Sequence, residues 1–81
     1  MRTVTVFRSR RIADMYLYVD KVEGLARVPQ DLQRRFGTPE KAMELELEPG
    51  RRLARADSAA VLRAIDDAGF YLQLPPQPSE S

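Results

Sequence analysis

The chain has 81 residues, no cysteine and no histidine, and its 13 basic and 12 acidic residues leave a net charge of +1. A single domain of this length buries only about 60–65% of its unfolded surface, so one modest core must supply its stability. The missing cysteines exclude a disulfide framework and thiolate metal sites, and the missing histidines remove the commonest general base and neutral metal ligand. The near-neutral charge gives no sign of a nucleic acid or a membrane as partner.

The longest apolar runs span only a few residues, and the N-terminus lacks the apolar segment of a secretory signal. These features predict a cytoplasmic protein with no membrane partner. Eleven of the basic residues are arginine, which suits bidentate pairing with carboxylate or phosphate. A GC-rich genome would produce the same bias without any functional meaning.

The first part of the chain predicts two strands. Residues 3–8 alternate in the manner of a strand, and residues 9–14 form a polar, basic loop. Residues 15–19 are the clearest strand, with one face made by Met15, Leu17 and Val19 and the other by Tyr16 and Tyr18. Because both faces are apolar or amphipathic, we predict that this strand is covered on both sides.

Residues 28–37 predict a short helix. Pro29 is expected at its first helical position, where the missing N–H costs nothing. Gly37 is expected to adopt the left-handed conformation that ends a helix, and Pro39 prevents its continuation. The helix would bury the face that carries Leu32 and Phe36.

Residues 41–48 alternate strictly, which predicts a strand with one buried and one wet face near a sheet edge. The apolar side chains are Met43, Leu45 and Leu47, and the wet ones are Glu44, Glu46 and Glu48. Successive carboxylates on such a face lie about 6.6–7 Å apart and diverge, so we interpret them as solvated and predict no metal site. Pro49 and Gly50 turn the chain, and residues 51–56 fit either a loop or a short returning strand.

Residues 58–68 predict a second helix, with Asp57 as its N-cap and Gly69 at its C-terminal end. Its apolar stripe consists of Val61, Leu62, Ile65 and Ala68. Residues 70–74 predict a final strand. The proline-rich and serine-rich residues 76–81 lack apolar side chains and predict a disordered tail after a single domain of residues 1–75.

The expected elements follow the order β-β-α-β-α-β. This order predicts an α+β fold with a single small, mostly antiparallel four-stranded sheet and two helices. The two-sided strands favour an α/β/α sandwich-like arrangement, in which helices cover both faces of the sheet.

Several segments resemble the YcgL family, and the resemblance runs from about residue 7 to residue 76. It is carried by Phe7-Arg8-Ser9, Met15-Tyr16-Leu17-Tyr18-Val19-Asp20-Lys21, Arg27-Val28-Pro29, Phe36-Gly37, Pro39, Ala42-Met43, Ala56-Asp57 and Tyr71-Leu72-Gln73-Leu74-Pro75-Pro76. The resemblance implies a small bacterial protein of uncharacterised function with an α/β/α sandwich fold. Family members are often encoded near a ribonuclease of the D type, which hints at RNA metabolism. The chain departs from the family pattern in its short tail and at Arg11, where lysine is common.

Arginine pairs and tyrosines form the one candidate interaction surface, which comprises Arg10, Arg11, Tyr16, Tyr18, Arg34, Arg35, Arg51 and Arg52. Basic side chains with stacking aromatic rings are the combination that proteins use to bind single-stranded nucleic acid. The RNA-recognition signature that would sharpen this interpretation is absent. The tyrosines can equally be amphipathic core residues with a wet hydroxyl.

The sequence offers no catalytic constellation. No serine or threonine has a histidine to activate it, and there is no phosphate-binding glycine loop. We therefore predict no enzymatic activity, no cofactor and no small-molecule substrate. The leading hypothesis is a protein-interaction or regulatory module with an unidentified protein partner, and the alternative is an accessory protein that binds single-stranded RNA.

Overall fold

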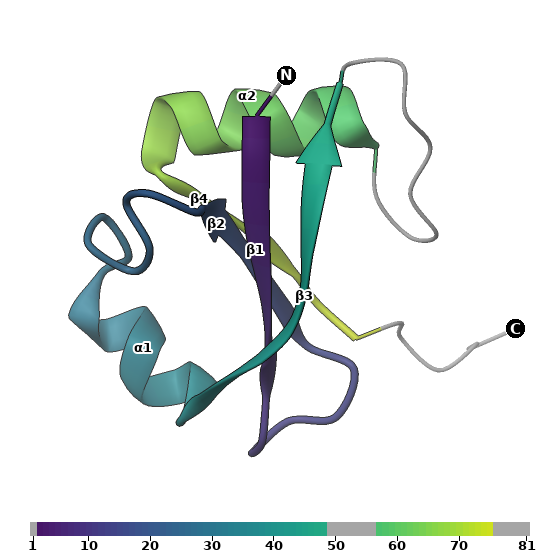
Figure 1. Cartoon of the computed structure of the whole chain (residues 1–81). Helices are drawn as coiled ribbons and strands as arrows, with labels where there is room; N and C mark the ends of the chain where they lie inside the picture. Colours follow the sequence, from purple (N-terminus) through teal and green to yellow (C-terminus); the bar gives the residue numbers. More distant parts are fainter. Residues whose placement is uncertain (1, 49–56, 76–81) are drawn as a thin grey trace, which may run out of the picture.

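The computed structural model of the chain describes residues 2–48 and 57–75. In these ranges, four strands and two helices follow the predicted order (Figure 1), namely β1 (Arg2–Ser9), β2 (Tyr16–Asp20), α1 (Gln30–Phe36), β3 (Pro39–Leu47), α2 (Ser58–Ala68) and β4 (Phe70–Gln73). The strands form one sheet in the order β3-β1-β2-β4, and each neighbouring pair is antiparallel. The predicted α+β class is confirmed. Residues 51–56 and the expected tail at 76–81 lie outside the described ranges.

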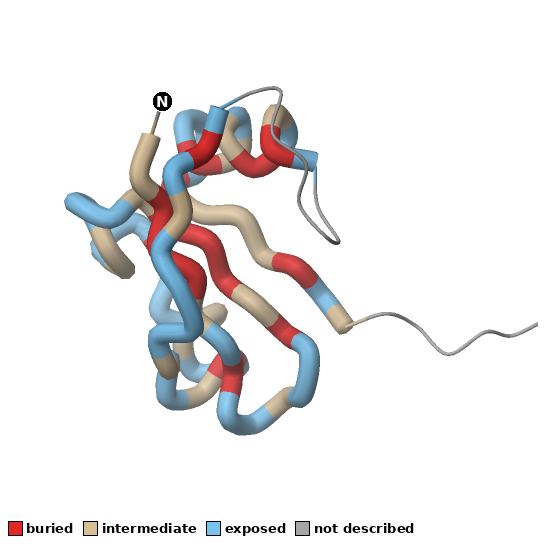
Figure 2. Tube along the Cα trace, turned by 45° about the vertical axis from the view of Figure 1, so that its right-hand side comes forward, coloured by how far each residue is buried: buried red, intermediate tan, exposed pale blue. Residues whose placement is uncertain are grey.

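Each face of the sheet carries one helix. Successive side chains of the inner strands point to opposite sides, so these strands contribute to a buried cluster on each face. On one face, Leu17 and Val19 of β2 belong to the buried cluster that contains Phe36 of α1. On the other face, Tyr18 belongs to the cluster that contains Val61 and Ile65 of α2. In Figure 2 the buried residues follow the inner strands and the side of α2 that faces the sheet. The predicted helical cover on both faces is therefore confirmed.

The ends of α1 differ in detail from the prediction. Pro29 is the N-cap rather than the first helical residue, because its ψ of 144° is extended and leads the chain back to the buried Val28. Gly37 has the expected positive φ of 82°, but its ψ of −162° is not left-handed helical. The extended ψ is needed because β3 already begins at Pro39, where an outer strand tolerates a residue without an N–H.

The helices cover less of the sheet than the apolar patterns predicted. Met43 is 49% exposed, because α2 packs against the other end of β3, where Leu47 is fully buried. Ala68 is exposed, and the buried stripe of the helix begins instead at Ser58, which is fully buried. Leu74 lies beyond the end of β4 and is 60% exposed. The sequence pattern identified the right elements but overestimated the length of the covered face.

Both ends of α2 match the prediction. The Asp57 carboxylate accepts a hydrogen bond from the Ala59 N–H at 3.1 Å, as an N-cap side chain should. Gly69 adopts the left-handed conformation with φ 92° and ψ −1°, and its N–H donates to the carbonyls of Ala64 and Ile65. Neither helix in residues 2–48 and 57–75 is long and apolar enough to cross a membrane.

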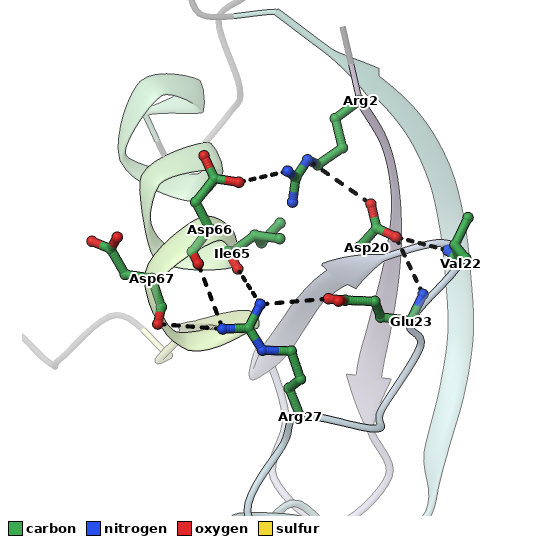
Figure 3. Close-up of polar contacts among 8 residues, drawn as sticks. All are labelled: Arg2, Asp20, Val22, Glu23, Arg27, Ile65, Asp66 and Asp67. Atoms are coloured by element: carbon green, nitrogen blue, oxygen red, sulfur yellow. Dashed lines mark hydrogen bonds and ion pairs between the residues drawn. The ribbon is translucent and has the colours of Figure 1, made fainter.

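A distant arginine completes the C-terminal end of α2 (Figure 3). The Arg27 guanidinium donates to the carbonyl oxygens of Ile65, Asp66 and Asp67, at 3.3, 3.5 and 3.4 Å. Its Nη1 atom also lies 3.7 Å from Oε1 of Glu23. A cation at this position interacts favourably with the helix dipole and gives the last carbonyls of α2 a hydrogen-bond donor, in addition to the Gly69 N–H that already reaches Ile65.

A second arginine links β1 to α2. The Nη2 atom of Arg2 donates to Oδ1 of Asp66 at 2.5 Å, and its Nε atom lies 3.9 Å from Oδ1 of Asp20 (Figure 3). These groups are partly exposed, so each ion pair stabilises the fold by no more than about 1 kcal/mol. The Arg2–Asp66 pair joins the start of β1 to α2, and the Arg2–Asp20 contact joins it to the end of β2.

Candidate functional site

The loop between β1 and β2 is shaped by the buried Ser9 hydroxyl. Ser9 Oγ donates a hydrogen bond to the carbonyl oxygen of Phe36 at 2.6 Å. The same oxygen accepts from the backbone N–H groups of Arg11 and Ile12, at 3.1 and 2.9 Å. A hydroxyl has one donor and two acceptor sites, and all three are used here. The bonds hold Arg10 and Arg11 in a defined place beside the C-terminus of α1.

Two hollows open beside this loop. The larger has a volume of about 560 Å³ and is lined by Arg8, Ser9, Arg10, Arg11, Ala13, Asp14, Tyr16 and Glu40. The smaller has a volume of about 330 Å³ and is lined by Arg10, Arg11, Gly37 and Thr38. Arg10 and Arg11 therefore border both hollows. In Figure 1 this loop lies at the end of the sheet that is remote from α2.

The three arginines of the larger hollow have different surroundings. Arg8 is paired, because its Nε and Nη2 atoms both lie 2.5 Å from Oε1 of Glu40. Arg11 donates from Nη1 to the carbonyl oxygen of Arg34 at 3.1 Å. Arg10 is exposed, and its guanidinium makes no hydrogen bond or ion pair within the described part of the chain. Arg10 is thus the cation that is available to a ligand.

The structure brings together some of the predicted surface residues. Tyr16 lines the larger hollow with Arg10 and Arg11, and Arg34 contacts Arg11 through its carbonyl oxygen. The Arg34 side chain points to Asp31 instead, at 3.3 Å, and Arg35 is exposed in the last turn of α1. The predicted residues Arg51 and Arg52 lie outside the described ranges.

Tyr18 is not part of the exposed surface, although the sequence analysis grouped it there. Its ring is 8% exposed and packs edge to face against Tyr71, with ring centroids 5.7 Å apart. Its hydroxyl donates to Oε1 of the buried Gln73 at 2.9 Å. Burial, assisted by the nearby Tyr71 and Tyr16 phenols, raises the pKa of the Tyr18 hydroxyl above its ordinary value of 10.0. The alternative interpretation, a core tyrosine, fits this residue.

We expect Tyr18→Phe to lower the free energy of unfolding by about 1–2 kcal/mol at neutral pH, because Gln73 loses its buried donor. The raised pKa means that the unfolded chain ionises first as the pH rises, so the wild type loses stability above about pH 10. Urea unfolding between about pH 8 and pH 11 should show a smaller alkaline loss in Tyr18→Phe. Tyr16→Phe is the matched control, and an identical alkaline loss in wild type and Tyr18→Phe would contradict the assignment.

We expect Ser9→Ala to destabilise the chain by about 1–3 kcal/mol, because the Phe36 carbonyl and two backbone N–H groups lose their partner. Urea unfolding measures the loss directly. Thr38→Ala is a suitable control, since Thr38 is exposed nearby and its hydroxyl makes no hydrogen bond within residues 2–48 and 57–75. Equal stability of the two variants would show that the Ser9 bonds do not hold the loop.

Five residues of the larger hollow were not predicted from the sequence, namely Arg8, Ser9, Ala13, Asp14 and Glu40. Arg8 and Glu40 become neighbours only through the antiparallel register of β1 and β3, in which they are direct partners. A shift in that register follows Val6, so the alternation of β3 alone does not give the pairing. The single local signal is the position of Arg8 at the end of an apolar strand.

The glutamate face of β3 is exposed, as the sequence analysis interpreted it. Glu44 lies 2.6 Å from Nζ of Lys41 and 3.4 Å from Nζ of Lys21. The hydrogen bond with Lys41, with a contribution from Lys21, lowers the pKa of the Glu44 carboxyl. Within residues 2–48 and 57–75, no three acidic side chains gather into a group that could hold a metal ion.

The chain is thus a small α+β domain in which a four-stranded antiparallel sheet carries one helix on each face. The polar hollow lies beside the loop between β1 and β2. The YcgL domain family model matches residues 4–76, so the chain belongs to the YcgL domain family. A YcgL domain-containing protein of Cellvibrio japonicus is 50% identical over 72 residues, which cover 89% of this chain and 74% of the relative. One from Pseudomonas aeruginosa is 49% identical over 79 residues, covering 98% and 81%. The family resemblance drawn from the sequence is confirmed.

Proposed function

We propose that the chain is a non-enzymatic protein-interaction module that binds its partner at the loop between β1 and β2. One observation carries this proposal: Arg10 and Arg11 border both hollows, and the Arg10 guanidinium has no partner within the described residues. The loop is anchored to α1 through Ser9, so these arginines are presented from a fixed backbone. Arginine, like tryptophan and tyrosine, is enriched among the residues that dominate the binding energy of protein interfaces, and a fixed backbone lowers the entropy cost of binding.

The lining of the larger hollow supports binding rather than catalysis. Among the described residues that line it, only Tyr16 and Ser9 carry a hydroxyl, and the donor and acceptor sites of the Ser9 hydroxyl are already occupied. One of its two carboxylates, Glu40, is paired with Arg8. No serine or threonine hydroxyl of this described lining is therefore free to act as a nucleophile beside a base, which supports binding as its role.

A protein partner is favoured over RNA by the aromatic residues and by the charges. Stacking of RNA bases needs exposed rings, but Tyr18 is buried and only Tyr16 lines the hollow. The lining also mixes three arginines with two carboxylates. Such a mixture matches the varied charges and backbone groups of a protein better than the uniform phosphates of a nucleic acid.

Site-specific photo-crosslinking tests this proposal. A benzophenone amino acid replaces Ala13, which lines the larger hollow, and in a matched control it replaces Ala60, which is exposed on α2 at the other end of the sheet. Irradiation in living bacterial cells should then give one defined protein adduct from position 13 and none from position 60. Adding Arg10→Glu should abolish the adduct, while Arg63→Glu, the same charge change on an exposed residue of α2, should leave it intact.

The other outcomes would overturn the proposal. An adduct that disappears on ribonuclease treatment would identify RNA as the partner. A protein adduct that forms equally from positions 13 and 60, or that survives Arg10→Glu, would show that the partner binds elsewhere. No adduct from position 13 at native expression levels would contradict a protein-binding role for this loop.

A further inference from the structure

We infer that the larger hollow recognises the carboxylates of an acidic protein segment, and that Glu40 competes with this segment by occupying Arg8. This inference rests on the proposed function and adds the chemistry of the partner. The hollow already contains one guanidinium–carboxylate contact, in which two nitrogen atoms of Arg8 lie 2.5 Å from Oε1 of Glu40. An incoming carboxylate would make the same type of contact with Arg10, whose guanidinium has no partner among residues 2–48 and 57–75.

The Arg8–Glu40 pair can exchange its partners readily. The side chains of Arg8 and Glu40 are 59% and 41% exposed, so water can replace either partner at little cost. Both residues line the hollow and remain partly exposed, and charges in such a position chiefly set specificity and association rate. The Glu40 carboxylate therefore resembles the expected ligand in charge and geometry. By pairing with Arg8 it lowers the affinity of the hollow for that ligand, but it does not block the hollow.

The remaining charges favour a peptide carboxylate over a polyphosphate. Asp14 and Glu40 would repel a chain that carries a negative charge on every unit. A peptide, in contrast, can offer backbone N–H groups to these carboxylates while its acidic side chains pair with Arg10 and Arg8. Arg11 already donates to the Arg34 carbonyl, so we assign the main contact with the ligand to Arg10.

Fluorescence anisotropy with a short labelled peptide of alternating glutamate and glycine tests the inference at low salt. The wild type should bind this peptide, and it should bind neither the matching glutamine–glycine peptide nor a labelled single-stranded oligouridylate as tightly. Arg10→Ala should weaken binding about tenfold, which corresponds to the loss of one charge-assisted contact. Arg63→Ala, which removes an exposed arginine from α2, should leave the affinity unchanged.

Glu40→Gln is the decisive variant. It removes the competing charge, and we expect it to tighten binding of the glutamate peptide about two- to fivefold. All variants should remain folded under the assay conditions, since the substituted side chains are not in the core and the Arg8–Glu40 pair that Glu40→Gln breaks is partly exposed. Three results would overturn the inference: unchanged or weaker binding of the glutamate peptide by Glu40→Gln, tighter binding of the oligouridylate than of the glutamate peptide by the wild type, or no peptide binding up to about 1 mM.

The two proposals can fail separately. If the position-13 adduct depends on Arg10 but the glutamate and glutamine peptides bind alike, the hollow binds a protein without selecting carboxylates. If the peptide binds as expected but the adduct is absent, the hollow recognises carboxylates and the proposed protein partner is wrong.

Discussion

Phe36→Ala should lower the free energy of unfolding by about 3–5 kcal/mol, the largest single effect expected in this chain. Phe36 is 1% exposed and is among the largest fully buried side chains, on the face of the sheet that α1 covers. A small domain has about 5–15 kcal/mol of stability in total, so the variant should lose a large share of it. Urea unfolding followed by far-UV circular dichroism measures the loss.

Two further variants separate packing from side effects of the substitution. Phe36→Leu keeps most of the buried volume and should cost only about 1–2 kcal/mol. Val22→Ala removes an aliphatic side chain that is 92% exposed, and its effect should stay within about 0.5 kcal/mol. A loss below about 1 kcal/mol for Phe36→Ala would mean that this face contributes little to stability.

The core and the candidate site are coupled through the same residue. The Phe36 carbonyl accepts the hydrogen bond of Ser9, which in turn holds the N–H groups of Arg11 and Ile12. A side-chain substitution that lets the end of α1 move therefore also moves the loop that presents Arg10 and Arg11. Binding assays should use variants with intact cores, which is why the tests above rely on exposed residues.

Gly69→Ala is the second large effect, and we expect it to cost about 2–4 kcal/mol. Gly69 has a φ of 92°, where a side chain adds about 1–2 kcal/mol of strain. In addition, an added Cβ would lie 2.4 Å from Cβ of Arg27 and 2.8 Å from its Cδ and Nε atoms. Arg27 would have to move, and it would lose its hydrogen bonds to the last carbonyls of α2.

Gly24→Ala provides the matched control for this prediction. Gly24 also has a positive φ, of 57°, but nothing lies within 4 Å of an added Cβ. It should therefore show the backbone strain alone, about 1–2 kcal/mol. In an Arg27→Gly background the cost of Gly69→Ala should fall to the value for Gly24→Ala, because this substitution removes the Cβ, Cδ and Nε atoms that the added Cβ would meet. Equal costs in both backgrounds would place the strain in the backbone and not in the contact with Arg27.

Most of the fold could be predicted from the sequence, but much of the candidate site could not. The sequence correctly brought Arg10, Arg11 and Tyr16 into one candidate surface, because they flank one loop between two recognisable strands. It could not separate Tyr18 from them, since alternation places Tyr16 and Tyr18 on the same face without saying where α2 covers it. Nor could it find the Arg8–Glu40 pair, whose members are 32 residues apart.

The amino-acid sequence by itself determined the order of the elements and both ends of α2. Alternation, helical spacing, Asp57 and Gly69 act within a few residues, so their signals are complete in the local sequence. Only the tertiary structure decided that Arg27 reaches the carbonyls of α2 from 38 to 40 residues away, and that Glu40 reaches Arg8. These contacts depend on strand register and on where each helix covers the sheet, which are set by the packing of the whole chain.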